Sequence, residues 1–235
     1  MVRAIMGSIE VNLQQVSARI RAACVAAGRD ERSVTLMAVS KTFPPEAVRT
    51  AHAAGQVTFG ENYVQEALAK MEALVDLRPR LAWHFIGPLQ SNKTRPVAEA
   101  FDWVHGIDRL KIAQRLAEQR PGWLPPLQLC LQVNVSGEAS KSGVAPADLH
   151  ALARDVAALP RERVRLRGLM SIPEPADDPL AQRAPHRMLR ELLDALNREG
   201  HDLDTLSMGM SADLEAAIAE GATIVRVGTA IFGSR

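Results

Sequence analysis

The chain has 235 residues, of which 47% are hydrophobic, enough to bury a large core in one barrel or one doubly wound sheet. Its 28 basic and 27 acidic residues leave a formal net charge of +1, so no overall charge attracts nucleic acid or a membrane surface, and we expect neither as a partner. Only Cys24 and Cys130 are cysteines, and the first residues lack a signal-peptide pattern, so we expect a cytoplasmic protein without disulfides or a metal site.

Helical and strand patterns alternate along the chain. An amphipathic helix is predicted first, over about residues 7–27, and eight strand–helix pairs follow it. The predicted strands cover residues 34–40, 56–62, 81–87, 101–108, 127–136, 164–172, 205–211 and 222–228. The predicted helices after them begin at residues 44, 63, 94, 109, 146, 186, 212 and 229.

This count predicts the fold class. Eight strand–helix pairs in this length are typical of a closed (β/α)₈ TIM barrel, here a single domain over residues 1–235. An open doubly wound sheet is the alternative, because periodicity alone does not separate the two. The number of pairs favours the barrel.

The carboxyl ends of the predicted strands carry the candidate functional residues, as in other barrels. Glycines, hydroxyls and amides predominate there, with one lysine, Lys41, and one arginine, Arg226. Hydroxyls and glycine amides at helix N-termini hold phosphate well, and the last two strands are the usual place for a phosphate site. The mixture predicts a phosphorylated ligand that also has an electrophilic carbon.

Lys41 follows an apolar strand directly. A partly desolvated lysine at a barrel mouth becomes a free amine near neutral pH and condenses with an aldehyde or ketone to a Schiff base. The alternative is an exposed lysine that only ends a strand. The glycine- and hydroxyl-rich turns after the last two predicted strands suit a phosphate and therefore favour the Schiff base. His84, next to Trp83 on an apolar strand, is interpreted as a core histidine.

Seven motifs in order resemble those of the YggS/PROSC family of pyridoxal phosphate homeostasis proteins. They are AVSKT, FGENYVQEA, WHFIGPLQSNK, VNVSGEASKSG, RGLMSIP, SMGMSADLEAAI and VRVGTAIFG, between residues 34 and 233. The resemblance implies a barrel similar to the N-terminal domain of alanine racemase, with pyridoxal 5′-phosphate (PLP) as cofactor. The cofactor-binding residues that it implies are Lys41, Asn62, Met170, Ser207, Ser211, Arg226, Gly228 and Thr229.

The resemblance also implies roles for these residues. Lys41 carries PLP as a Schiff base, and Ser207 or Ser211 contacts the phosphate together with Gly228 and Thr229. The two residues near the cofactor ring are Asn62 and Met170. The residue that faces the pyridine nitrogen is Arg226.

The expected function follows from Arg226. An arginine only donates hydrogen bonds, so the pyridine ring of PLP stays a weak electron sink and gives a carbanion little stabilisation. Racemases of this kind use an acid–base residue from another domain or subunit, and this chain ends at Arg235, soon after the last barrel element. We therefore expect no robust enzyme activity, but a monomeric protein that buffers PLP or supplies it to apo forms of PLP-dependent enzymes.

Two enzyme functions remain as alternatives. A weak PLP-dependent amino-acid racemase would use the same lysine. A Schiff-base aldolase acting on a sugar phosphate would need a carboxylate at a neighbouring strand end, and only Glu61 has that position.

Two departures from the family pattern concern lysines. Many relatives carry a second lysine two residues after the Schiff-base lysine, where this chain has Phe43, and many have a lysine-containing C-terminal tail that is absent here. Lys93 and Lys141 match the family pattern and are candidates for secondary PLP adducts.

Overall fold

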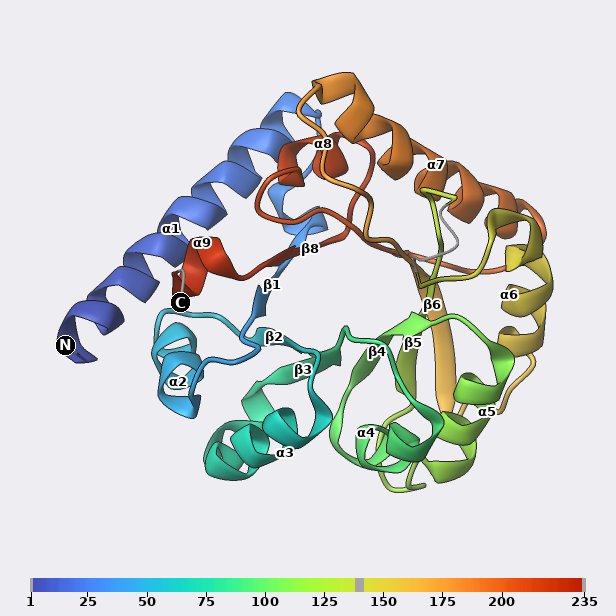
Figure 1. The fold of residues 1–235 in the computed structure, drawn as a ribbon, viewed down its shortest axis with the longest axis horizontal. Coiled ribbons are helices and arrows are strands. Elements are labelled where there is room, and N and C mark those ends of the chain that lie inside the picture. The colour runs from blue at the N-terminus through green and yellow to red at the C-terminus, as the bar shows by residue number, and fades with distance from the viewer. Residues whose placement is uncertain (1, 138–141, 234–235) are drawn as a thin grey trace.

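A computed structural model of the protein shows eight parallel strands in a closed barrel with helices around it (Figure 1). The structure describes residues 2–137 and 142–233. Each strand pairs with its neighbour in the sequence, and the last strand pairs with the first, so the closed barrel is confirmed and the open sheet was wrong. The strands are β1 (Thr35–Val39), β2 (Thr58–Glu61), β3 (Ala82–Phe85), β4 (Trp103–Ile107), β5 (Leu127–Gln132), β6 (Val164–Met170), β7 (Thr205–Ser207) and β8 (Ile224–Val227).

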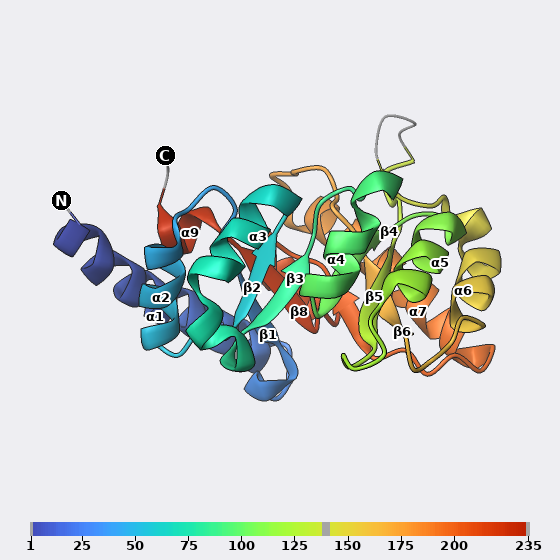
Figure 2. The same ribbon diagram turned by 90° about the horizontal axis from the view of Figure 1, so that it is seen from below.

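The helices follow the predicted order. They are α1 (Val2–Ala26), α2 (Pro45–Ala53), α3 (Val64–Ala73), α4 (Thr94–Ala100), α5 (Leu110–Gln119), α6 (Leu149–Ala157), α7 (Pro179–Arg198), α8 (Leu214–Ala219) and α9 (Thr229–Phe232). Short 3₁₀ turns supplement them: η1 (Glu31–Ser33), η2 (Val75–Arg80), η3 (Ser91–Lys93) and η4 (Pro146–Asp148). Seen from the side, the helices lie along the outside of the barrel wall (Figure 2).

Two predicted helix boundaries were wrong. The helix expected from residue 186 begins at Pro179, because the Asp178 carboxylate accepts the Ala181 N–H at 2.7 Å and caps the first turn. Pro185 lies inside that helix. The spacing from Met71 predicts Val75 on the apolar face of the helix that begins near residue 63, but α3 ends at Ala73 and Val75 is 71% exposed.

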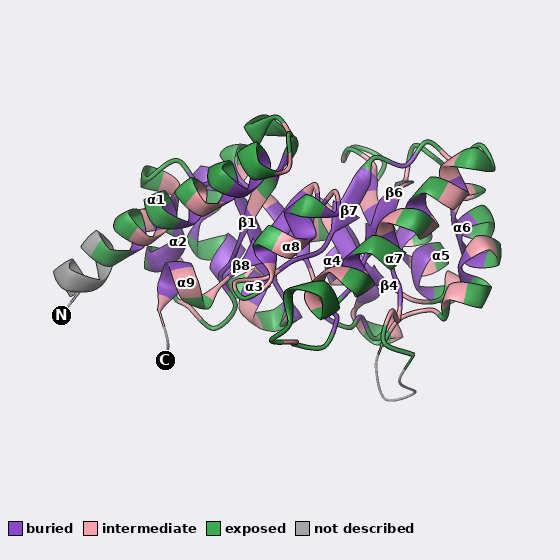
Figure 3. Ribbon diagram, turned by 90° about the horizontal axis from the view of Figure 1, so that it is seen from above, coloured by how far each residue is buried: buried purple, intermediate pink, exposed green. Residues whose placement is uncertain are grey.

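The apolar core lies between the strands and the helices. The strands are buried and the helices expose their outer faces (Figure 3). Helix α1 buries Ile9, Leu13, Val16 and Ile20, four residues at helical spacing. It contacts α8 and α9 on one side and α2 on the other, so it covers the seam where β8 meets β1.

Gly168 sits where β6 and β7 approach most tightly. It pairs with Thr205, and a Cβ at residue 168 would lie 1.8 Å from the Thr205 carbonyl oxygen. Backbone atoms cannot move aside as a flexible side chain does, so the pairing requires glycine here.

We expect Gly168→Ala to lower the free energy of unfolding by about 2 kcal/mol or more, because the added methyl group forces the two strands apart. Gly122→Ala is the matched control: its Cβ would meet only the Arg163 side chain, at 3.3 Å, and should change stability by less than about 0.5 kcal/mol. Urea denaturation measures both. Equal stability of the two variants would contradict the tight approach of β6 and β7.

Candidate functional site

The predicted site residues come from five adjacent strands, β6, β7, β8, β1 and β2. All lie at or just beyond the carboxyl ends of these strands: Met170 at the end of β6, Ser207 and Ser211 at the end of β7 and after it, Arg226, Gly228 and Thr229 around the end of β8, Lys41 after β1 and Asn62 after β2. The barrel therefore gathers all eight on one half of its mouth.

Lys41 lies on a turn that leaves β1. Ser40 is buried and its N–H donates to the Gly60 carbonyl at 3.0 Å, which extends the pairing with β2. The Phe43 N–H donates back to the Ser40 carbonyl at 3.0 Å, and Thr42 has a φ of 67°, a left-handed conformation rare for a threonine. The turn leaves Lys41 exposed, so the desolvation that the sequence analysis expected is not present.

A buried ion pair lies under this turn. Lys70 of α3 donates through Nζ to Glu61 Oε1 at 2.5 Å and to the Ser40 carbonyl at 2.7 Å. The Ser40 hydroxyl donates to the same Glu61 oxygen at 2.7 Å. Burial raises the pKa of Glu61, while the Lys70 ammonium and the Ser40 hydroxyl act in the opposite direction. Glu61 is thus engaged inside the protein, which counts against an acid–base role in an aldolase.

Arg226 crosses the inside of the barrel. Its Nη1 donates to the Ser207 carbonyl at 2.6 Å and to the Ser207 hydroxyl at 2.9 Å, and its Nη2 donates to the Ser171 carbonyl at 2.7 Å. Burial lowers the pKa of Arg226 to about 10, which still leaves the guanidinium charged at neutral pH. Ser207 is held inside the barrel by these contacts, so of the two predicted phosphate serines the half-exposed Ser211 is the better candidate.

Two buried histidines continue this network. His105 Nδ1 lies 2.8 Å from the Ser207 hydroxyl, and His105 Nε2 lies 2.9 Å from His84 Nδ1. Because Arg226 donates to the hydroxyl, we assign the Ser207 O–H as donor to His105 Nδ1 and the His105 Nε2–H as donor to His84 Nδ1. This assignment makes both rings neutral. The interpretation of His84 as a core histidine is confirmed.

Burial explains why both rings stay neutral. It lowers the pKa of His84 to about 3, and burial, together with the neighbouring His84 ring and the charge of Arg226, lowers the pKa of His105 well below its usual range. The unfolded chain protonates near the ordinary value of 6.5, whereas the folded chain does not until the pH is far lower. The unfolded state therefore binds more protons between about pH 6.5 and 3, and stability falls as the pH falls through this range.

We expect His84→Gln to reduce the loss of stability at low pH. Below about pH 6, its free energy of unfolding should fall less steeply than that of the wild type, by about 1.4 kcal/mol per pH unit. Urea denaturation at a series of pH values measures the slope. Above about pH 7.5 the difference between the two proteins should be constant, and parallel curves over the whole range would contradict the neutral assignment.

Three polar atoms at the mouth lack a hydrogen-bond partner among the described residues. They are Asn62 Oδ1, Ser171 Oγ and Glu61 Oε2, and all three are buried. Buried polar atoms are normally paired, and each unpaired one costs about 1–3 kcal/mol. Unpaired atoms at the ends of β2 and β6 fit a site that receives a polar ligand.

The turn after β8 lies beside the Lys41 turn. A Cβ on Gly228 would lie 3.2 Å from the Val39 carbonyl oxygen, so glycine permits the close approach. Helix α9 starts at Thr229, and its first N–H groups have no acceptor within the helix, as a phosphate site needs. Phe232 of α9 stacks on Phe43 with ring centroids 5.0 Å apart, so Phe43 connects the Lys41 turn to the segment after β8.

The remaining predicted residues have separate positions. Met170 is buried at the end of β6 and pairs in register with Ser207. Lys93 is half-buried at the end of η3. Lys141 lies outside the described residues.

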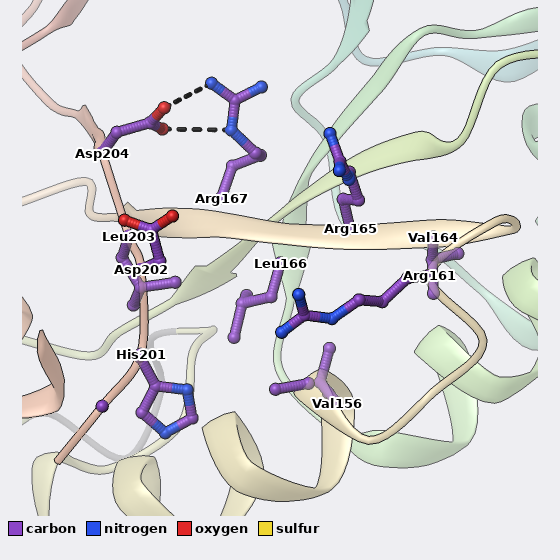
Figure 4. Close-up of a pocket in the computed structure, with 12 residues that line it drawn as sticks. Val156, Arg161, Val164, Arg165, Leu166, Arg167, His201, Asp202, Leu203 and Asp204 are labelled. Carbon is purple, nitrogen blue, oxygen red and sulfur yellow. Dashed lines mark hydrogen bonds and ion pairs between the residues drawn. The ribbon is translucent and has the colours of Figure 1, made fainter.

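A cavity at the opposite end of the barrel is separate from this site (Figure 4). There Arg167 forms an ion pair with Asp204, donates to Gln128 Oε1 at 2.9 Å and stacks over Trp103, 5.0 Å from the ring centroid. These contacts join the middle of β6 to the amino-terminal ends of β4, β5 and β7. The predicted site residues lie at the other end of the barrel.

Sequence reasoning missed Lys70, Glu66 and His105. Lys70 could have been found, because it falls within the apolar stripe of α3 beside Ala67 and Met71, and a lysine in such a stripe needs a buried partner. No local pattern marks His105, whose partners lie on β3 and β7.

Comparison with known proteins identifies the family. Residues 11–235 match the model of the alanine racemase N-terminal domain. A pyridoxal phosphate homeostasis protein of Pseudomonas aeruginosa is 66% identical over 230 residues, which cover 98% of this chain and 97% of that protein. The chain belongs to the pyridoxal phosphate homeostasis protein family. The resemblance seen in the seven motifs is thus confirmed.

Solved structures agree with this assignment. PipY of Synechococcus elongatus, solved with PLP bound, is 39% identical with a TM-score of 0.82, covering 96% of this chain and 100% of that one. Alanine racemase of Corynebacterium glutamicum is 18% identical with a TM-score of 0.70, covering 98% of this chain and 62% of that one, and shows the shared fold alone. Within residues 2–137 and 142–233, no helix is long and apolar enough to cross a membrane.

Proposed function

We propose that this protein binds PLP at the mouth of the barrel and acts in intracellular PLP homeostasis. One observation carries the proposal: Lys41, Arg226 and the Gly228–Thr229 turn share one end of a barrel whose relative PipY was solved with PLP bound. The relative from Pseudomonas aeruginosa is named for the same role. The proposed PLP-binding unit is a single domain over residues 1–235.

The proposed contacts follow the chemistry of each side chain. PLP supplies an aldehyde, which forms a Schiff base with a lysine amine. Lys41 is the proposed point of attachment because its side chain is exposed at the mouth. Hydroxyl and N–H donors for the phosphate come from Ser211, Gly228 and Thr229.

The ring contacts complete the proposed site. Arg226 offers a charged donor to the pyridine nitrogen. Asn62 and Ser171 offer buried polar atoms that have no partner within the part of the chain that the structure describes. Met170 provides an apolar surface.

A carrier fits this site better than a catalyst. Arg226 keeps its charge and gives the pyridine nitrogen no carboxylate partner, so the bound ring gains little capacity to stabilise a carbanion. A catalyst would also need an acid–base residue beside the cofactor. Tyr63, the single tyrosine, is 54% exposed at the start of α3, and Glu61 is held by Lys70, so neither is well placed for that role. We therefore propose a monomeric, cytoplasmic protein without robust enzyme activity, which buffers PLP or passes it to apo enzymes.

The absorbance of the purified protein with added PLP tests this function. We expect a yellow band that borohydride abolishes while it fixes the cofactor on the peptide containing Lys41. Lys41→Ala should lack both the band and the adduct, whereas the control Lys93→Ala should keep them. Failure of the wild type to take up PLP would reject the proposal, and rapid interconversion of D- and L-alanine by the loaded protein would reject the carrier role.

A further inference from the structure

The residues on both sides of Lys41 are tied to one group of side chains, which we call the Lys70 cluster: Lys70 and Glu61, which are buried, and Glu66, which is partly exposed. On one side, the Ser40 carbonyl accepts from Lys70 and the Ser40 hydroxyl donates to Glu61. On the other side, the Thr42 N–H donates to Glu66 Oε1. The cluster therefore holds the backbone before and after Lys41 and leaves the Lys41 side chain outside.

All the hydrogen-bond donors of Lys70 are engaged. Its ammonium has three N–H donors, and three acceptors surround it: Glu61 Oε1 at 2.5 Å, the Ser40 carbonyl at 2.7 Å and Glu66 Oε1 at 3.3 Å. The residue is only 3% exposed. A lysine that is charged, saturated and buried does not compete with Lys41 for an aldehyde.

Stability alone gives no reason for this arrangement. Burying an ion pair costs about as much desolvation energy as the attraction returns, and apolar residues of similar volume often stabilise more. Glu61 Oε2 adds a buried oxygen without a partner in the described residues. Thr42 adds a left-handed backbone, which costs about 1 kcal/mol or more outside glycine. These costs all concern the turn that carries Lys41.

We propose that Lys70 is a positioning residue for Lys41: through Glu61, Glu66 and the Ser40 carbonyl it holds the turn that presents the Lys41 amine. This inference rests on the proposed function, in which Lys41 carries PLP. A held turn keeps the amine at the mouth of the barrel and slows the loss of bound PLP. A loosened turn lets the amine move away and speeds that loss.

The test uses two variants of the full chain. Lys70→Met alone leaves a lone buried carboxylate, so Lys70→Met is combined with Glu61→Gln, which removes both charges while the introduced amide keeps an acceptor for Ser40. The matched control is Glu220→Gln, which alters another buried carboxylate, one that pairs with Arg183, Arg187 and Arg190 of α7. Both variants lose buried charge pairing, but only the double variant touches the Lys41 turn.

The first readout needs no cofactor. Hydrogen exchange of the amides of residues 40–43 is measured by mass spectrometry in PLP-free protein. We expect the double variant to exchange at least about tenfold faster there, because the turn opens more often, and Glu220→Gln to match the wild type. Unchanged exchange in the double variant would overturn the inference, whatever PLP does.

The second readout is the rate of PLP loss. Each protein is loaded with PLP and diluted, and the bound-cofactor absorbance is followed over time. We expect loss at least about tenfold faster from the double variant than from the wild type and Glu220→Gln. Equal rates would overturn the inference while leaving the proposed function intact. A wild type whose borohydride adduct is not on Lys41 would instead reject Lys41 as the point of attachment in the proposed function.

Discussion

The site depends on closure of the barrel between its first and last strands. β1 pairs with β8 from Thr35 opposite Ile224 to Ala38 opposite Val227. This register sets the Lys41 turn beside the Gly228 turn, although the two are far apart in the sequence. Helix α1 covers the outside of the seam, and the Phe43–Phe232 stack joins the two turns at the mouth. The contacts proposed from Lys41 and from the Gly228–Thr229 turn can reach one ligand because of this closure.

Polar side chains occupy part of the barrel interior, where apolar side chains would need no hydrogen-bond partners. Arg226, Ser207, His105 and His84 form one line of hydrogen bonds in which each group has a defined donor or acceptor role. Burial keeps the histidines neutral, so a single positive charge, that of Arg226, remains on this line. Such a line holds Arg226 in one orientation, because turning it would remove the donors to the buried Ser207 hydroxyl and to the Ser171 carbonyl.

The Lys70 cluster and Arg226 support the mouth from different sides. Lys70 and Glu61 hold the turn after β1, whereas Arg226 joins the ends of β6, β7 and β8. The Lys70 cluster affects where the Lys41 amine lies, and Arg226 affects the electronic character of a bound ring. In the proposed function the cofactor has to be retained but unreactive, and we propose that these two arrangements serve those two needs.

The sequence by itself determined the order of strands and helices, the barrel and the residues at its mouth. Apolar periodicity and glycine or proline positions are local, and eight repeats leave little choice of closed fold. The α7 start at Pro179 is also local, because Asp178 caps it, whereas the exposure of Lys41 and the engagement of Ser207 depend on the tertiary structure. Tertiary structure alone decided the Lys70 cluster and the histidine line, because their partners come from different strands and helices. Which of these side chains are buried together depends on packing, and packing has no local pattern.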